Sequence, residues 1–479
     1  MKQRAWVALA ASLACAAAGS AVLQGGGSPV RWALADGGDA DAPAPAVSTA
    51  TVAPRMAVNA PARRRASGGA DNGPTLPLLV ITGSEPPRHE GVFTYYPVRI
   101  DEKQARAAMK GGHLSIPTPD GLHLDLAFEH AVEHENGNWS WVGHLDGPDD
   151  TQRAVITFGP DSTVATLPDS DGQQRKLTVE GGQTYLVSAP LSSLHVGVNP
   201  LGDAIKPVGV PGAGLAGTGA LDEALGTPIV SAADAAAGKS ISSAAGQTTV
   251  DVLAIYSSGF RQAKGSTSAA ITELTNRFDV ANQVLRNSQI DASFRMVRAQ
   301  EAQAPDDTDN TQMLDAIRTS TPWVQSMRDQ VGADLVTFVR QYNQANNSCG
   351  VAYIPPGNYA AAGDLMYSVV SDGSLPTGYY CEATTLAHEL GHNLGAQHNH
   401  EQDATGGLFP YSYGYRNFSA KFYDVMAYGP DATQRFWTFS NPQVQCKGLP
   451  CGVADYADVA RTLRLTMPIA AKFRTSKTH

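Results

Sequence analysis

The sequence contains few charged residues, few aromatic residues and no excess of positive charge. Of 479 residues, 17% are charged and 7% are aromatic, and the formal net charge at pH 7 is −10. A negative chain has no electrostatic reason to bind nucleic acid or an anionic membrane surface, so we expect neither as a partner. The hydrophobic content of 42% is sufficient for a buried core, and the length fits two or three domains.

Long hydrophobic runs are absent beyond the first 21 residues, so no transmembrane anchor is expected. The N-terminal run from Ala5 to Ala18 is short for a membrane span. It follows the basic segment Met1–Arg4 and precedes the small residues at 19–21, which is the pattern of a secretory signal peptide. We therefore expect residues 1–21 to be a signal peptide and the protein to be secreted, either extracellular or periplasmic. Cys15 lacks the usual apolar residue three positions earlier, which disfavours a lipoprotein.

Cysteine is absent from residue 16 to residue 348, and the whole chain has only five. Without the signal peptide an even number remains, as expected of disulfides in an oxidising compartment. Cys446 and Cys451 enclose only four residues and are expected to close a tight loop, which leaves Cys349 to pair with Cys381. The paired close spacings of zinc fingers and zinc ribbons are missing, which disfavours a cysteine-rich metal site.

Two segments with little sequence complexity divide the chain. Residues 22–75 and residues 201–247 are rich in Ala, Gly, Pro and Ser, so we interpret both as linkers. Between them, residues 76–200 contain β-branched and aromatic runs at 92–96 and 153–158, which predict a β-rich domain. The histidines of this domain are scattered without the spacing of a metal site.

Residues 248–479 alternate between strand and helix patterns. Apolar runs at 250–256, 292–297, 335–339 and 350–354 predict strands, and apolar residues recur at helical spacing over 271–285 and 313–331. Pro322 is expected to break the second helix, and a last helix is expected over 455–473. This order predicts an α/β domain with a mixed, mostly parallel sheet flanked by helices.

The segment from Thr384 to His398 has the spacing of a metal site. On a helix, His388 and His392 lie four residues apart and project from one face, so both can bind one zinc ion. Glu389 emerges beside the metal, where a carboxylate can accept a proton from water. A glycine at 395 allows a sharp turn that can return His398 as a third ligand. Three protein ligands leave one coordination position open, which is typical of a catalytic zinc ion.

This pattern, His-Glu-x-x-His-x-x-Gly-x-x-His, resembles the zinc signature of the metzincin peptidases. The resemblance implies that Met426 lies in the methionine-containing turn beneath the metal. It also suggests that Tyr428 approaches the metal and stabilises an oxyanion, although a packed loop tyrosine is an alternative. A thermolysin-like peptidase is disfavoured, because the sequence shows no glutamate motif for a third ligand after His392.

Further features resemble the reprolysin-like branch, and the closest family that the resemblance suggests is the bacterial peptidyl-Asp metalloendopeptidases. Cys349 precedes a segment that resembles the strand at the edge of a reprolysin-like cleft, and Cys381 precedes the zinc helix. The resemblance implies that this segment pairs with an extended substrate, whereas an internal sheet strand is the alternative. The edge-strand residues are Gly350, Val351, Ala352 and Tyr353.

The resemblance implies a zinc metalloendopeptidase that binds protein or peptide substrates, carries one catalytic Zn²⁺ and is a monomer. Residues 76–200 would be its propeptide, although a permanent binding module is an alternative, and a non-catalytic zinc-containing binding protein is the alternative to an enzyme. Inhibition by a propeptide cysteine is excluded, because that region has none after signal removal. Inhibition by a carboxylate, by a histidine or by simple occlusion of the cleft remains open. If cleavage occurs next to Asp, Arg416, Lys421 or Arg435 could line the subsite, although each could be an ordinary surface charge.

Overall fold

The computed structural model describes residues 77–82, 85–146, 153–170, 172–197, 202–207, 228–229, 247–403, 405–429 and 434–477. The expected signal peptide (residues 1–21) and the first expected linker (residues 22–75) lie outside these ranges. Among the helices that are described, none is long and apolar enough to cross a membrane.

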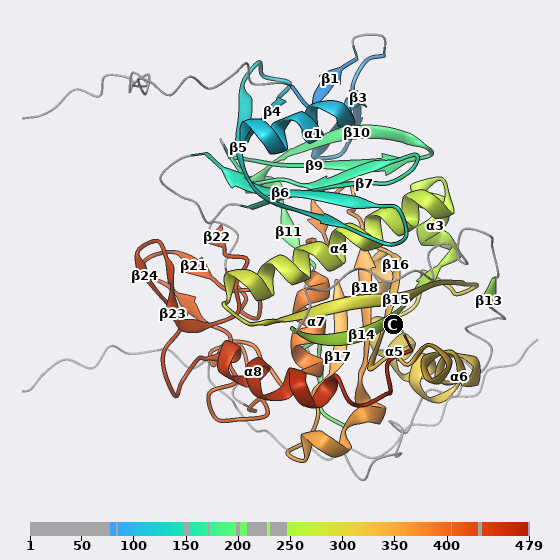
Figure 1. The fold of residues 1–479 in the computed structure, drawn as a ribbon, viewed down its shortest axis with the longest axis vertical. Coiled ribbons are helices and arrows are strands. Elements are labelled where there is room, and N and C mark those ends of the chain that lie inside the picture. Colours follow the sequence, from blue (N-terminus) through green and yellow to red (C-terminus); the bar gives the residue numbers. More distant parts are fainter. Residues whose placement is uncertain are drawn as a thin grey trace, which may run out of the picture. The chain divides into compact units, whose positions relative to one another are not determined.

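The N-terminal domain is an antiparallel sheet that runs in the order β1-β3-β10-β9-β8-β7-β6-β5-β4, with β2 beside β3. Most of these strands are labelled in Figure 1. The two ends of this order approach each other, because the amide of Leu78 donates to the carbonyl of Ser115 at 2.8 Å. The strands are β1 Leu79–Ile81, β2 Arg88–Glu90, β3 Phe93–Ile100, β4 His113–Pro117, β5 His123–Glu133, β6 Trp139–Leu145, β7 Arg153–Phe158, β8 Thr163–Thr166, β9 Gln173–Glu180 and β10 Gln183–Pro190.

One helix, α1 (Glu102–Gly111), lies in this β-rich domain. Asp101 caps its first turn, and Gly112 ends it in the left-handed conformation, where a residue without a β-carbon is favoured. Ala105 and Ala108 bury the inner face against the same core that contains Trp139 and Trp141. The two tryptophans therefore share one face of β6, as their spacing of two residues requires.

The C-terminal domain is built on a mixed sheet in the order β12-β17-β18-β16-β14-β15-β13. The central pairs β15–β14, β14–β16 and β16–β18 are parallel, whereas β17 runs antiparallel to β18. The expected mixed and mostly parallel sheet is therefore present. The strands are β12 Ala204–Ile205, β13 Pro228–Ile229, β14 Thr248–Ser257, β15 Ala292–Ala302, β16 Leu335–Gln341, β17 Gly350–Tyr353 and β18 Tyr367–Asp372.

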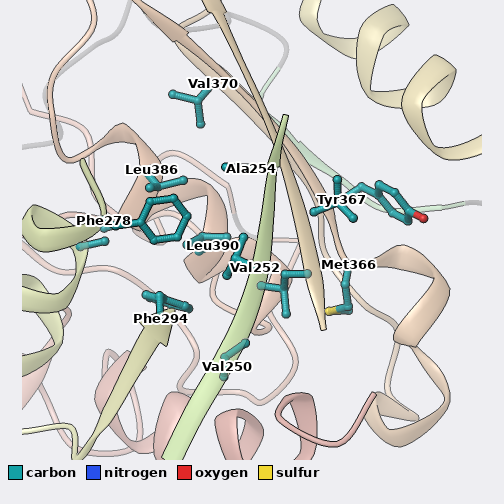
Figure 2. Packing of buried hydrophobic residues seen from close by; sticks show 14 of the residues in the cluster. Val250, Val252, Ala254, Phe278, Phe294, Met366, Tyr367, Val370, Leu386 and Leu390 are labelled. Atoms are coloured by element: carbon teal, nitrogen blue, oxygen red, sulfur yellow. The ribbon is translucent and has the colours of Figure 1, made fainter. Parts of the chain in front are cut away.

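Helices cover this sheet and place the metal-binding segment. They are α3 Ser258–Lys264, α4 Thr267–Asn287, α5 Asn310–Thr319, α6 Pro322–Val331, α7 Thr385–Asn393 and α8 Val459–Ala470. Pro322 begins α6 at the predicted break, because proline is favoured in a first helical turn, where its missing amide hydrogen has no helical partner to lose. Leu386 and Leu390 of α7 pack beside Phe278 of α4 in the main core (Figure 2). This apolar face fixes α7 against the sheet.

Between α7 and α8 the chain forms short strands and loops rather than regular layers. These strands are β20 Arg416–Asn417, β21 Phe422–Tyr423, β22 Gln434–Arg435, β23 Asn441–Cys446 and β24 Leu449–Cys451, and one further short strand, β19 Tyr379–Tyr380, precedes α7. Both expected disulfides are formed: Cys446–Cys451 closes the loop between β23 and β24, and Cys349–Cys381 joins the start of β17 to the segment before α7.

The β-rich domain and the C-terminal domain meet along helix α4 (Figure 1), and the contact combines polar pairs with small apolar clusters such as Val280 with Val142 and Val155. Four polar residues of α4, at the i, i+3, i+4 and i+7 positions of one face, hydrogen bond to the β-rich domain. The bonds join Ser162 to Thr272 (2.9 Å), Asn138 to Thr275 (3.0 Å), Thr166 to Asn276 (2.9 Å) and His134 to Asp279 (3.0 Å). A polar face of this kind would be well solvated if the β-rich domain were removed.

Candidate metal centre

Three histidines converge in the buried centre of the C-terminal domain. The Nε2 atoms of His388 and His392 lie 3.0 Å apart, and His398 Nε2 lies 3.2 Å and 3.1 Å from them. Neutral imidazoles gain nothing by placing three such nitrogens together, whereas a cation between them accepts all three lone pairs. The structure thus brings together the three residues that the sequence predicts as metal ligands.

The turn that returns His398 depends on Gly395. Helix α7 ends with the amide of Ala396 donating to Gly391 O and the amide of Gly395 donating to His392 O. This paired ending requires a left-handed residue, and Gly395 has φ of +96°. A β-carbon there would also lie 2.6 Å from the β-carbon of Leu408. Glycine is therefore needed both for the backbone angle and for the close packing.

Two carbonyl groups orient the first two imidazoles. His388 Nδ1 lies 2.7 Å from Val425 O, and His392 Nδ1 lies 2.9 Å from Ala396 O. Each Nδ1 donates to its carbonyl, which leaves the Nε2 lone pair free for a metal. Burial lowers the pKa of His388 below its ordinary value and that of His392 to about 4. Both rings are therefore neutral, as metal ligands must be.

Met426 lies directly beneath α7. It is fully buried, and a β-carbon on Gly391 would lie 2.6 Å from the Met426 sulfur. The glycine between the first two histidines therefore makes room for this methionine. Val425, one residue earlier, supplies the carbonyl that orients His388. The segment of Val425 and Met426 thus packs against α7 and orients His388.

Glu389 is buried beside the three histidines and faces strand β17. Its side chain occupies the space where a β-carbon on Gly350 would lie, 2.2 Å from Glu389 Oε1. Among the described residues Glu389 Oε2 has no hydrogen-bond partner, and burial raises the pKa of this carboxyl well above its ordinary value. A buried carboxyl group without a partner is costly unless a ligand or substrate uses it. Glu389 is therefore placed where it could accept or donate a proton.

A fourth residue, Asp203, completes the cluster and was not predicted from the sequence. Its Oδ1 lies 2.6 Å from His398 Nε2 and 3.5 Å from His392 Nε2, and its Oδ2 lies 3.7 Å from His388 Nε2. Burial would raise the pKa of Asp203, but the three histidines hold it well below the ordinary value, so the group is a carboxylate. The expectation that residues 201–247 are only a linker does not hold for residues 202–207.

Tyr428 faces the same centre. Its hydroxyl group lies 3.5 Å from His388 Nε2 and donates to Asp203 Oδ2. Its ring centre lies 5.4 Å from that of His388 and 5.0 Å from that of His398. The side chain of Asn399 holds the turn, because Asn399 Oδ1 accepts from the Tyr428 amide at 3.1 Å. The hydroxyl can therefore reach a ligand of the metal.

The donor set fits a divalent metal of the zinc type. Neutral imidazoles suit zinc, and four ligand atoms from Asp203, His388, His392 and His398 lie within 4.8 Å of one another. Asp203 Oδ1 is buried and has no hydrogen-bond partner among the described residues, as expected of an oxygen that faces a cation. A bound zinc ion would be held by these side chains.

Strand β17 borders the centre. Within the described residues it has β18 on one side and only the two-residue strand β12 on the other. Gly350, Val351, Ala352 and Tyr353 therefore lie one strand in from the end of the described sheet, beside the two-residue strand β12. The Cys349–Cys381 disulfide fixes the start of this strand relative to the segment that leads into α7.

Other residues considered from the sequence lie around the centre or away from it. Arg416 Nη1 donates to Tyr428 O at 2.7 Å, and Arg435 Nη1 donates to Val425 O at 3.1 Å. Both arginines thus contact the turn beneath the metal, whereas Lys421 is exposed. His400 stacks between Tyr413 and Tyr456 and does not join the cluster.

Comparisons with known proteins match the two domains separately. Residues 246–457 match the family described as "Metallo-peptidase family M12B Reprolysin-like", and residues 74–191 match the family described as "BamI lipocalin-like domain". The second match fits the antiparallel β-rich domain, and the first covers the sheet, α7 and the metal centre.

Curated relatives named peptidyl-Asp metalloendopeptidase include proteins from Pseudomonas aeruginosa PAO1, Xanthomonas campestris pv. campestris and Stenotrophomonas maltophilia K279a. The first is 31% identical over 257 residues (48% of this chain, 41% of the relative), and the second is 29% identical over 233 residues (47% and 52%). The third is 25% identical over 349 residues (71% and 78%). The chain therefore spans about half the length of the first two relatives. Residues 246–457 of this chain are thus similar in sequence to the reprolysin-like metallopeptidases and to the bacterial peptidyl-Asp metalloendopeptidases.

Proposed function

We propose that this chain is a secreted, zinc-dependent endopeptidase of the metzincin type, made as a precursor and cleaving next to Asp. The observation that carries the proposal is the convergence of His388, His392 and His398 with Glu389 buried beside them. A structural metal site needs only its ligands. It has no need of a buried carboxyl group beside the ligands that lacks a hydrogen-bond partner. Glu389 is therefore the feature that favours catalysis over binding alone.

Each residue of the centre has a separate role in the proposed peptide hydrolysis. When bound, zinc would polarise the scissile carbonyl and a water molecule. Glu389 would accept a proton from the attacking water and deliver it to the leaving amine. Val425 O and Ala396 O hold the two helical imidazoles in place during this exchange. The main chain of β17 would pair with an extended substrate once residues 204–205 no longer cover its outer side, because an exposed edge strand offers unpaired amide and carbonyl groups.

Tyr428 is proposed to donate a hydrogen bond to the oxyanion that forms at the carbonyl carbon. We expect Tyr428→Phe in the processed enzyme to lower kcat by about 10²-fold, the usual loss for one oxyanion donor, with little change in KM. Steady-state kinetics on a fluorogenic peptide would measure both constants. Tyr411→Phe is a suitable control, because Tyr411 stacks on Phe409 away from the metal ligands. An unchanged kcat in Tyr428→Phe would assign this tyrosine to packing alone.

The precursor proposal draws on the contact between the two domains. Polar residues of α4 make part of that contact, and they would be well solvated after separation. Small apolar clusters, in which Val280 meets Val142 and Ala269 meets Val164, make the other part. The paired cysteines and the signal-like N-terminal sequence support export to an oxidising compartment.

A preference for Asp is supported by cations near the metal turn. The Arg435 side chain is only 9% exposed, and its Nε lies 2.7 Å from Glu382 Oε2. Burial disfavours its charge, but Glu382 and Tyr423 keep the pKa of Arg435 above its ordinary value. Arg435, Glu382 and Thr384 line one wall of a cavity of about 120 Å³ beside the start of α7, and the β-rich domain forms the opposite wall, so removal of that domain would open this side to substrate. A substrate carboxylate entering this cavity would meet a fixed guanidinium group.

We expect Arg435→Met to reduce the preference for an Asp peptide over the matching Asn peptide by about tenfold or more, since hydrogen bonds to charged groups contribute about 1.5–3 kcal/mol. The readout is the ratio of kcat/KM values for the two peptides. This ratio is measured within one variant, so partial unfolding caused by an unpaired Glu382 does not change it. Lys421→Met removes an exposed charge and should leave the ratio unchanged. A constant ratio in Arg435→Met would exclude Arg435 as the specificity group.

A further inference from the structure

The segment on either side of Asp203 follows the edge of the catalytic sheet. Strand β12 pairs in parallel with β17, with Ala204 opposite Ala352 and Ile205 opposite Tyr353. The amide of Ala352 donates to Asp203 O, and the amide of Ile354 donates to Ile205 O, both at 2.9 Å. These two amides are donors that an extended substrate would need. Residues 202–207 and a substrate therefore compete for the same strand edge.

Contacts before and after the metal hold this segment in place. Strand β11 (His195–Val196) pairs with β19, and the amide of Cys349 donates to Gly197 O at 2.8 Å. On the other side of Asp203, Lys206 Nζ donates to Thr405 O at 2.5 Å. Contacts on both sides of Asp203 along the chain thus fix the position of its carboxylate. Its side chain is 4% exposed, so water reaches it poorly.

We propose that Asp203 is the fourth protein ligand of the metal in the precursor, and that residues 202–207 keep the peptidase latent until they are removed. This inference rests on the proposed function and extends it to regulation. A catalytic zinc site needs an open position for water and substrate, whereas four protein ligands close the coordination sphere. Asp203 also accepts from Tyr428, the proposed oxyanion donor. The Asp203 side chain would therefore fill the open coordination position and would also engage the Tyr428 hydroxyl group.

The chemistry of Asp203 suits this role better than a neutral side chain would. A carboxylate adds negative charge to three neutral imidazoles and compensates the charge of a divalent cation. Because the carboxylate is joined to the enzyme by the same chain, its effective concentration at the metal is high. Cutting the chain near residues 202–207 removes that advantage, so the same ligand becomes easy to displace. Latency would then be lost by proteolysis without any change in the catalytic domain itself.

The test uses the full-length precursor with Glu389→Ala, so that self-cleavage cannot occur, and with Co²⁺ in place of zinc as a spectroscopic probe. Azide is titrated into the protein, and the visible spectrum reports whether a coordination position is open. We expect Asp203→Ala in this background to bind azide about tenfold or more tightly than the parent, because the binding-competent state is no longer a minor population. Asp203→Asn keeps the side-chain shape and serves where the alanine variant is unstable.

Asp120→Ala is the matched control, because Asp120 is a half-exposed carboxylate of the β-rich domain that pairs with Arg175. Its azide affinity should equal that of the parent. Equal azide affinity in the parent and in both Asp203 variants would overturn the proposal. In a second arm with Glu389 intact, the Asp203→Ala precursor should hydrolyse a short fluorogenic peptide faster than the unprocessed parent, although residues 204–205 still pair with β17. If the processed enzyme is also inactive, the proposed function fails, while the azide result still decides the role of Asp203.

Discussion

Glu389→Gln is expected to lower kcat/KM of the processed enzyme by about 10²–10⁴-fold, the usual contribution of a general base and acid. The amide keeps the size and packing of the glutamate against Gly350 but cannot accept the proton of the attacking water. The three histidines are untouched, so the zinc content should not change. Kinetics on a fluorogenic peptide and metal analysis of the same preparation measure the two quantities.

The control for this variant is Asp455→Asn, which makes the same change at a side chain that is 84% exposed. It should keep both activity and zinc. Full activity in Glu389→Gln would show that another group moves the proton. Loss of zinc together with activity would instead assign Glu389 to holding the metal centre together.

His398→Ala is expected to weaken zinc binding by more than about 100-fold, a loss that even an outer contact to a metal ligand can cause. The two helical histidines alone would give an incomplete coordination sphere. Activity should fall with the metal, and added zinc should raise the melting temperature of the parent but not that of the variant. Competition with a chromogenic zinc chelator measures the affinity, and thermal unfolding with and without zinc measures the stabilisation.

His400→Ala is the matched control, because it removes an imidazole only two residues further along the chain. Its ring stacks on Tyr413 and Tyr456, with ring centres 3.5 and 4.0 Å away, and Nε2 lies 3.0 Å from Tyr456 O. This variant is expected to lose some stability but to keep its zinc affinity. The assignment of ligands would be wrong if His400→Ala lost zinc and His398→Ala retained it.

The metal centre could be predicted because most of its information is local. His388, Glu389 and His392 lie within one helical turn, and Gly395 determines where the chain turns back. Such relations depend on helical geometry and on glycine conformation, which follow from spacing along the chain. The main sheet and its helices were also predictable, since apolar periodicity marks buried faces. The helix break at Pro322 was predictable for a similar reason, because it follows from the residue type at one position.

Helix α1 was not predicted, because its buried positions are the small residues Ala105 and Ala108. Alanines give a weak apolar pattern among the surrounding charges, so the segment does not stand out within a β-rich domain. The Asp101 cap and the glycine at 112 were signals that could have identified it. The burial of the polar face of α4 was also missed, since a polar stripe normally indicates contact with water.

Asp203 could not be identified from spacing, because it lies far from the histidines in the sequence and within a segment poor in apolar residues. Its position depends on the pairing of β12 with β17, which is a long-range contact. One signal was available: the segment Asp203-Ala204-Ile205 combines a carboxylate with a β-branched residue in otherwise Gly- and Ala-rich sequence. The sequence left a carboxylate inhibitor open but gave no means of choosing which one.

Digestion of casein by the processed protein would show most directly whether this chain is a zinc endopeptidase. Product ends are sequenced by mass spectrometry, with and without a zinc chelator and after zinc is restored. We predict internal cuts that cluster next to Asp, disappear with the chelator and return with zinc. A processed protein that binds zinc and leaves casein intact would contradict the proposal and favour a non-catalytic zinc-containing binding protein.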